Sequence, residues 1–129
     1  WIMVKHFIVH ASFHNNYSAI ADPKFREKVR IASETIDDVL ANGRRVVTLT
    51  KESPNLEDMD ADVYIIPGDV SAKNAAAFIK DGDHVVVYGR ETGICVNKIY
   101  EDALSVGASA EISPMGAVDF REYLGYYWL

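Results

Sequence analysis

The sequence predicts a three-layer α/β/α fold around a mostly parallel sheet of about five strands. Two observations carry this prediction. Apolar strand-like runs alternate along the chain with segments of helical spacing, and the strand-like runs are continuously apolar, as parallel strands covered on both faces are. The 129 residues suffice for one compact domain, and neither a repeat nor a linker divides them. We therefore expect a single domain over residues 1–129.

The first strand and the first helix have clear local signals. The run VKHFIV predicts a strand over Val4–Val9. Asp22 followed by Pro23 predicts a helix start, because aspartate accepts hydrogen bonds from the first amide groups and proline fits the first helical turn. Apolar side chains then recur at spacings of three and four, at Phe25, Val29, Ala32, Ile36, Val39 and Leu40. Gly43 is expected to end this helix in the left-handed conformation.

The remaining elements follow the same alternation. Apolar runs predict strands at residues 46–49, 63–66, 84–88 and 109–112. Residues 51–61 are acidic and contain Pro54, so we expect a loop there. Ser71 is suited to cap a short helix. A longer helix is expected from about Cys95 to Val106, with an inner face formed by Val96, Ile99, Tyr100, Ala103 and Leu104.

Composition excludes several functional classes. Apolar residues make up 49% and charged residues 25%, which is typical of soluble globular domains. The net charge of −6 argues against nucleic acid and against an anionic membrane surface, since both attract basic faces. No apolar run is long enough to cross a bilayer, and no basic start precedes a long apolar stretch as in a signal peptide. The single cysteine fits a reducing cytoplasm.

The segment from Gly89 to Val96 combines features of a nucleophile site. Ligands of open parallel sheets bind beyond the carboxyl ends of the strands, and the segment G-x-x-T-x-x-C-V lies at such an end. With Thr92 as the helix cap, Cys95 would be the third helical residue. There the free amides and the helix dipole would favour a reactive thiolate and hold an oxyanion. The alternative is that a lone cysteine is a small, inert core residue.

This segment resembles the isochorismatase-like cysteine hydrolases, the family of nicotinamidases and related amidases. The similarity covers about thirty residues: VVVYG, Thr92, Cys95 with Val96, the sequence Asp-Ala-Leu from residue 102, and Gly107. It implies an α/β/α fold, a Cys95 nucleophile, a cis peptide between Arg90 and Glu91, and a homo-oligomer. We expect this protein to use no cofactor. The residues between strand and nucleophile, Glu91, Thr92, Gly93 and Ile94, are then expected to bind the substrate.

Two positions of the family triad hold other residues in this chain. His10 stands where the resemblance places an aspartate, and Pro67 stands where it places a lysine. Lys73 follows a few residues later and is the candidate for the lysine's role, which it could reach only if the loop is reshaped. The metal-binding Asp-x-His of nicotinamidases has no counterpart in TLTKESPN, so we expect no metal. Histidine is a competent base for a thiol, and His10 is therefore the candidate partner of Cys95, with His14 as a second candidate.

Two functional hypotheses follow. In the first, the protein hydrolyses a small amide or related carbonyl compound through a Cys95 thioester. In the second, catalysis has lapsed, and the protein binds a ligand or assembles as a homo-oligomer. The acidic residues 52–62 could face a basic partner, although such runs are often only solvated. The aromatic residues 123–129 could pack on the protein's own sheet or form an interface.

Overall fold

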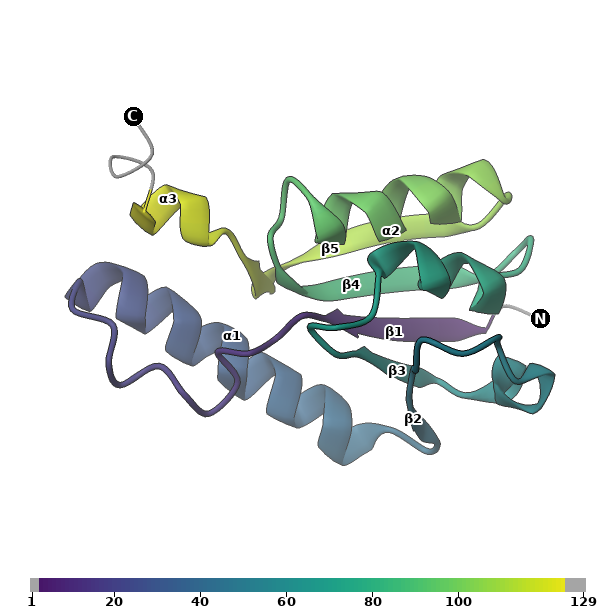
Figure 1. Ribbon diagram of the computed structural model, residues 1–129, viewed down its shortest axis with the longest axis horizontal. Helices are drawn as coiled ribbons and strands as arrows, with labels where there is room; N and C mark the ends of the chain where they lie inside the picture. Colours follow the sequence, from purple (N-terminus) through teal and green to yellow (C-terminus); the bar gives the residue numbers. More distant parts are fainter. Residues whose placement is uncertain (1–2, 125–129) are drawn as a thin grey trace.

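The computed structural model describes the backbone of residues 3–124 and the side chains of residues 3–122 (Figure 1). Strands, α-helices and 3₁₀ helices (η) follow one another in a single alternation. Their bounds are β1 Val4–Val9, α1 Pro23–Asn42, β2 Val46–Thr48, η1 Leu56–Asp60, β3 Val63–Ile66, η2 Ala72–Phe78, β4 His84–Arg90, α2 Cys95–Ser105, β5 Ser109–Val118 and α3 Phe120–Leu124. The expected α/β class with a five-stranded parallel sheet is confirmed.

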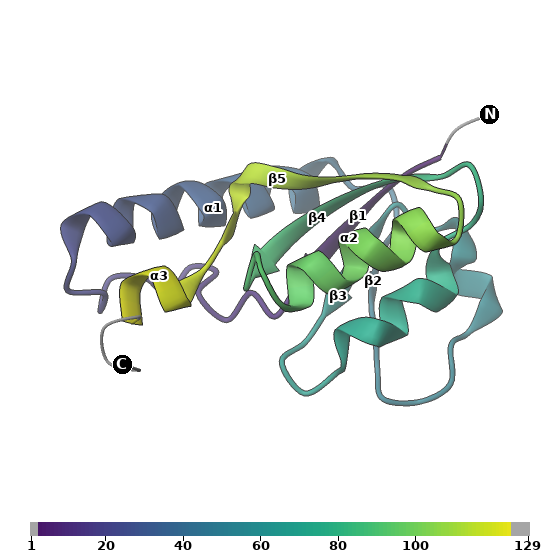
Figure 2. The ribbon, with the colours of Figure 1, turned by 90° about the horizontal axis from the view of Figure 1, so that it is seen from above.

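The sheet order β2-β3-β1-β4-β5 places β1 at the centre. The chain leaves β1 toward α1 on one face, whereas β3 and β4, which pair with β1 on either side, lead to η2 and α2 on the other face (Figure 2). The end of β1 is therefore the topological switch point, the place where ligand crevices form in open α/β sheets.

Two hydrophobic clusters bind the layers together. On one face, Phe7, Val85 and Val87 of the sheet pack with Val96 and Ile99 of α2. On the other face, Ile8 and Val86 pack with the apolar side of α1, which comprises Phe25, Val29, Ala32 and Ile36. Strand residues therefore alternate between the two clusters, as the pleat requires. Of the predicted inner face of α2, Val96, Ile99 and Ala103 are buried, whereas Tyr100 is half-buried and Leu104 is 47% exposed.

The caps of α1 agree only in part with expectation. The Asp22 carboxylate accepts hydrogen bonds from the Lys24 and Phe25 amides, and Pro23 is the first helical residue, as predicted. Gly43 ends the helix but has a φ of −69°, so the predicted left-handed conformation is wrong. Glycine is favoured there for space, because a Cβ at residue 43 would lie 2.9 Å from Cγ2 of Val63.

Two elements differ from their predicted extents. The acidic loop contains η1, whose first turn is capped by the Asn55 side chain, which accepts a hydrogen bond from the Glu57 amide. Strand β5 continues through Pro114 to Val118, six residues beyond the predicted end. Pro114 lies between Ile112 and Ala117, where the register with β4 shifts, and proline is tolerated at such an irregularity of an edge strand. Asp119 and Phe120 are thereby carried to the carboxyl edge of the sheet.

The core also contains one buried ion pair that sequence analysis did not predict. The Lys5 ammonium group is fully buried and lies 2.9 Å from Oδ2 of Asp83. It also donates a hydrogen bond of 2.7 Å to the Phe78 carbonyl. Asp83 in turn accepts from the Lys80 amide. The pair joins the start of β1 to the turns that flank η2 and β4.

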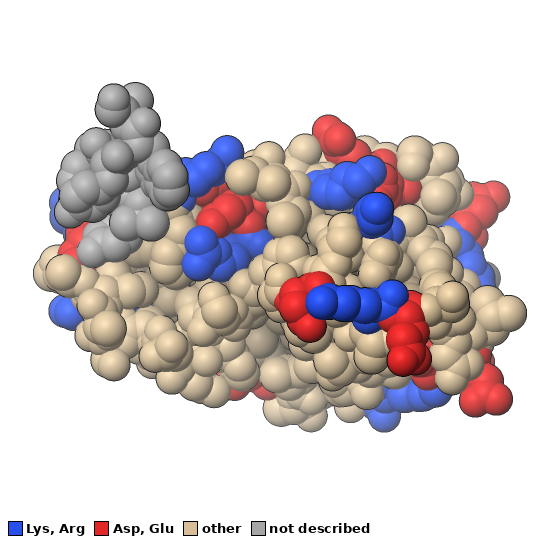
Figure 3. All heavy atoms as spheres, viewed as in Figure 1, with Lys and Arg blue, Asp and Glu red and all other residues tan. Residues whose placement is uncertain are grey.

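On the face shown in Figure 3, lysine and arginine side chains are interspersed with aspartate and glutamate, so this face has no extended patch of one sign. None of the helices formed by residues 3–124 combines the length and apolar character needed to cross a membrane. The predicted aromatic segment 123–129 lies outside the described side chains.

Candidate functional site

The sheet brings the predicted residues to one edge. In the parallel ladders, Val9 is paired with Ile66 of β3 and with Gly89 of β4. The segments that follow these residues, which begin with His10, Pro67 and Arg90, therefore lie together. The peptide bond between Arg90 and Glu91 is cis, at the position that the family resemblance implies. The predicted carboxyl-edge location of the segment is thus correct.

Cys95 occupies a different helical position from the predicted one. It is the first residue of α2, and Ile94 rather than Thr92 is the cap residue. The sulfur-bearing side chain is half-buried and packs against the cluster on the α2 face. Burial and the nearby Glu91 carboxylate raise the pKa of the Cys95 thiol, and the Arg90 guanidinium only partly offsets them. This direction is opposite to the thiolate-rich sulfur that the sequence predicts.

The amide groups expected to hold an oxyanion are largely engaged. The Ile94 and Val96 amides both donate to the Glu91 carbonyl, each at 3.1 Å. Within the described part of the chain, the Cys95 amide has no hydrogen-bond partner. One donor, rather than the predicted pair at Ile94 and Cys95, is therefore available beside the sulfur.

The predicted bases do not contact the sulfur. His10 follows β1 with a φ of 49°, and its Nε2 lies 2.7 Å from the Val70 carbonyl oxygen. A carbonyl only accepts, so Nε2 carries the proton and Nδ1 is the basic nitrogen. Lys73 is exposed on η2, and among residues 3–122 no ion pair involves its side chain. His14 instead contacts Asp37 of α1 at 2.5 Å, on the opposite face from Cys95.

Glu91 is not free to bind a substrate as predicted. Its Oε2 accepts hydrogen bonds from the Arg90 guanidinium at 2.9 and 2.6 Å. Its Oε1 accepts from the Phe120 amide at 2.5 Å. The Arg90 guanidinium also lies 4.0 Å from the centre of the Phe120 ring. These contacts join the loop before α2 to the segment after β5.

Asp119 makes a second connection between the same segments. Its carboxylate accepts from the Thr92 hydroxyl at 3.1 Å, from the Gly93 amide at 3.4 Å and from the Arg121 guanidinium at 2.6 Å. The Arg121 hydrogen bond, aided by Thr92, lowers the pKa of Asp119 to about 2. Thr92 and Gly93 therefore have structural partners that the sequence did not reveal.

Asp119→Asn should remove part of the acid sensitivity of the fold. The pKa of Asp119 is lowered in the folded chain, so its contribution is present above the unfolded value of about 3.9 and is lost as the pH falls toward about 2. We expect a loss of about 1 kcal/mol at pH 6, because solvent screens the half-exposed Arg121 partner. Urea unfolding at pH 6 and pH 2 checks this, since the difference between variant and wild type should be clearly smaller at pH 2, where much of the folded Asp119 is protonated. A constant difference would contradict the assignment.

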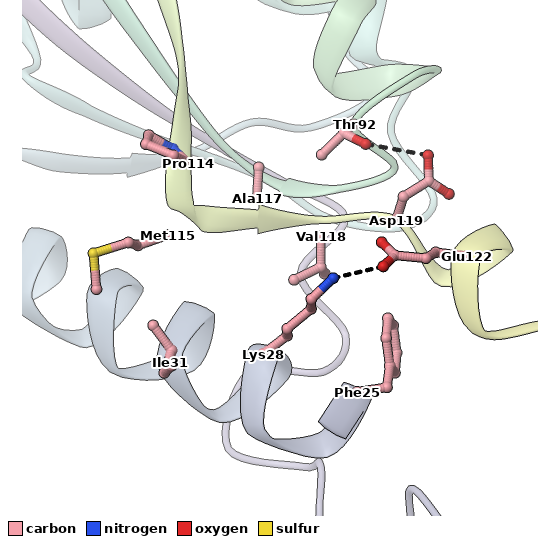
Figure 4. A pocket seen from close by; sticks show the side chains of 10 residues that line it. All are labelled: Phe25, Lys28, Ile31, Thr92, Pro114, Met115, Ala117, Val118, Asp119 and Glu122. Atoms are coloured by element: carbon pink, nitrogen blue, oxygen red, sulfur yellow. Dashed lines mark hydrogen bonds and ion pairs between the residues drawn. The ribbon is translucent and has the colours of Figure 1, made fainter. Parts of the chain in front are cut away.

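A cavity of about 360 Å³ lies between α1 and the end of β5 (Figure 4). Its volume falls in the lower part of the range for small-molecule sites, about 300–1,000 Å³. The wall is mostly apolar with a polar end, and consists of Phe25, Lys28, Ile31, Thr92, Pro114, Met115, Ala117, Val118, Asp119 and Glu122. Lys28 reaches from α1 toward Glu122 of α3, with a separation of 2.5 Å. Thr92 is the one predicted site residue in this wall.

The cavity and the cysteine lie on opposite faces of the sheet. Phe25 and Val118 of the cavity wall belong to the α1 cluster, whereas Cys95 packs against the α2 cluster. The sequence did not reveal Lys28, Asp119 or Glu122 as site residues. The signal that could have identified Asp119 was the rule that the ends of parallel strands carry sites, applied to a fifth strand extended through Pro114.

Among residues 3–122, no three histidine, cysteine, aspartate or glutamate side chains converge as a metal ion would require. No protein-family model matches the chain, and neither the curated proteins nor the solved structures contain a significant match.

Proposed function

We propose that this protein is a small-molecule-binding member of the α/β class, which uses the cavity between α1 and β5 and no longer uses Cys95 as a nucleophile. The observation that carries the proposal is the cavity itself, in which an apolar wall ends in the charged side chains of Lys28, Asp119 and Glu122. Cavities of this size, mostly apolar with a few convergent polar groups, are typical of ligand sites.

The groups that a thiol hydrolase would need also support the proposal that Cys95 is not a nucleophile. A thiol nucleophile needs a lowered pKa, an adjacent base and amide donors for the oxyanion. Here the pKa of Cys95 is raised, Nε2 of His10 is directed to the Val70 carbonyl, and the Ile94 amide donates to the Glu91 carbonyl. The thiol is therefore not activated, and two of the groups that would assist it, Nε2 of His10 and the Ile94 amide, have local partners.

Filling the cavity should abolish binding. With octanol as a neutral apolar probe, we expect saturable chemical-shift changes in amide NMR spectra that are confined to the cavity residues of α1 and β5. Ile31→Trp places a larger side chain into the wall and should remove these changes. Leu104→Trp is the matched control, because Leu104 is exposed on α2 across the sheet. Shifts that persist in Ile31→Trp, or that cluster around α2, would contradict the proposal.

A cysteine hydrolase is the second candidate function. It is favoured by the half-buried Cys95 at the first position of α2, whose amide has no partner among the described residues. In this reaction Sγ attacks a carbonyl carbon of a small amide, Nδ1 of His10 takes the thiol proton and returns it to the departing amine, and water then hydrolyses the thioester. If an amide substrate is found, loss of turnover in Cys95→Ala and in His10→Gln would support this candidate against the first.

The thiol should react slowly with iodoacetamide in the native protein. The pKa of Cys95 is raised in the folded state, so the folded chain holds a neutral thiol at pH values where the unfolded chain is already a thiolate. We expect the native rate to rise only above the free-thiol value of about 8.5, and the rate at pH 7.5 to be lower than in urea-unfolded protein. Faster labelling of the native protein near neutral pH would favour the hydrolase.

We further propose that this protein is a cytoplasmic homo-oligomer. The single cysteine suits a reducing compartment, and the family resemblance of residues 85–112 is to proteins that form homo-oligomers. Light scattering coupled to size-exclusion chromatography measures the mass in solution. A mass equal to one chain over a wide concentration range would remove the oligomer from the proposal.

A further inference from the structure

The polar end of the cavity contains two ion pairs of different character. Asp119 accepts from three donors, Thr92, Gly93 and Arg121, and its carboxylate is therefore saturated. Lys28 and Glu122 have only each other among the described side chains, and both are 58% exposed. Exposed pairs of this kind contribute little to stability. The Lys28–Glu122 pair is thus the one that a ligand can exchange at small cost.

Lys28 and Glu122 differ in the length of the helix that carries them. Lys28 stands on the 20-residue helix α1, and Phe25 and Ile31, three residues before and after it, place apolar side chains on the same helical face. Glu122 stands on α3, which has five residues. A ligand group that replaces Glu122 would meet a cation anchored on a long helix beside an apolar wall, whereas one that replaces Lys28 would depend on a carboxylate carried by a single short turn.

We infer that the cavity takes an apolar molecule with one carboxylate, and that this carboxylate replaces Glu122 on Lys28 while the apolar part lies against Phe25, Ile31 and Val118. The inference rests on the proposed function and names the ligand class of the same cavity. Lys28 keeps one carboxylate partner in the exchange, and the displaced Glu122 side chain, which is 58% exposed, becomes solvated. Figure 4 shows the lysine directed along the cavity toward Glu122, where the incoming group would bind.

Three probes with the same chain, octanoate, octanol and octylamine, test the ligand class by calorimetric titration of the full chain at pH 7. Octanoate should bind more tightly than octanol, and octylamine more weakly. Lys28→Met should lower octanoate affinity about tenfold and change octanol affinity less than about twofold. Glu122→Gln should raise octanoate affinity about threefold, because the competing carboxylate is gone. Lys24→Met, an exposed lysine on α1 outside the cavity wall, is the matched control and should change neither.

The outcomes distinguish the carboxylate ligand class from the proposed binding function of the cavity. If octanol binds in the cavity but octanoate gains nothing, or if octylamine binds most tightly, the carboxylate inference is overturned and the binding function stands. Equal losses for octanoate and octanol in Lys28→Met would show that the lysine shapes the cavity without binding a carboxylate, which also overturns the inference. If none of the three probes binds, the proposed function and the ligand class are both rejected.

Discussion

Gly89→Ala is expected to destabilise the protein by about 3–4 kcal/mol, the largest effect of any small substitution in β4. Gly89 has a φ of +113°, which alanine adopts only with strain. A Cβ on residue 89 would also lie 1.9 Å from the Val9 carbonyl oxygen, a backbone atom of the paired strand β1. The central ladder must therefore shift. Urea unfolding followed by circular dichroism measures the loss.

Alanine substitutions at two other glycines distinguish backbone strain from steric overlap of the added Cβ. Gly82 has a φ of +86°, but no atom lies within 4 Å of the place that a Cβ would occupy, so Gly82→Ala should cost about 1 kcal/mol from backbone strain alone. Gly68 has neither a positive φ nor a neighbour within 4 Å, and Gly68→Ala should be nearly neutral. Equal losses at residues 89 and 82 would show that the close approach of β4 to β1 does not exist.

Asp83→Asn is expected to cost about 3 kcal/mol. The Lys5 ammonium is fully buried, and Asp83 is its only anionic partner among the described residues. The asparagine oxygen can still accept from the Lys80 amide, so the local turn is preserved while the buried charge loses its counter-ion. Breaking one side of a buried pair leaves an uncompensated charge, and this explains the large effect. Equilibrium urea unfolding measures it.

The double variant Lys5→Met/Asp83→Asn tests the explanation. Removing both charges leaves neither stranded, so its loss should be smaller than the sum of the two single losses. The surface pair Lys98–Asp102 on α2 is the control, because Lys98 is half exposed, and Asp102→Asn should cost less than about 0.5 kcal/mol. Additive losses at residues 5 and 83 would mean that the two side chains do not interact.

Much of the architecture could be predicted because it depends on local patterns. Pro23 after Asp22, the apolar spacing of α1 and the largely apolar runs of β1, β3 and β4 depend on neighbours in sequence. The predictions that were wrong, the end of β5 and the conformation of Gly43, depend on where these residues lie in the folded sheet. Pro114 ends a strand only where its missing amide is needed, and whether β5 is an edge strand is a property of the whole fold. For the same reason, sequence alone did not reveal why Gly43 must be small.

The candidate site was harder to predict than the fold. The carboxyl edge and the start of α2 follow from strand order and spacing, and the structure places Cys95 there. The partners of each side chain do not follow. Glu91 bonds to the Phe120 amide 29 residues later, and Thr92 to Asp119 27 residues later. These contacts decide which groups are free, and they arise only when the loop and the end of β5 meet in space.

Because of these contacts, the region around Cys95 is built from two segments that are far apart in the sequence. Glu91 and Thr92 lie in the loop that precedes Cys95, yet the Phe120 amide and the Asp119 carboxylate that bond to them come from the segment after β5. Transplanting residues 84–105 into another scaffold would move the sulfur without the framework that orients it. The smallest portable version of this site is therefore two separate strand ends, grafted as a pair.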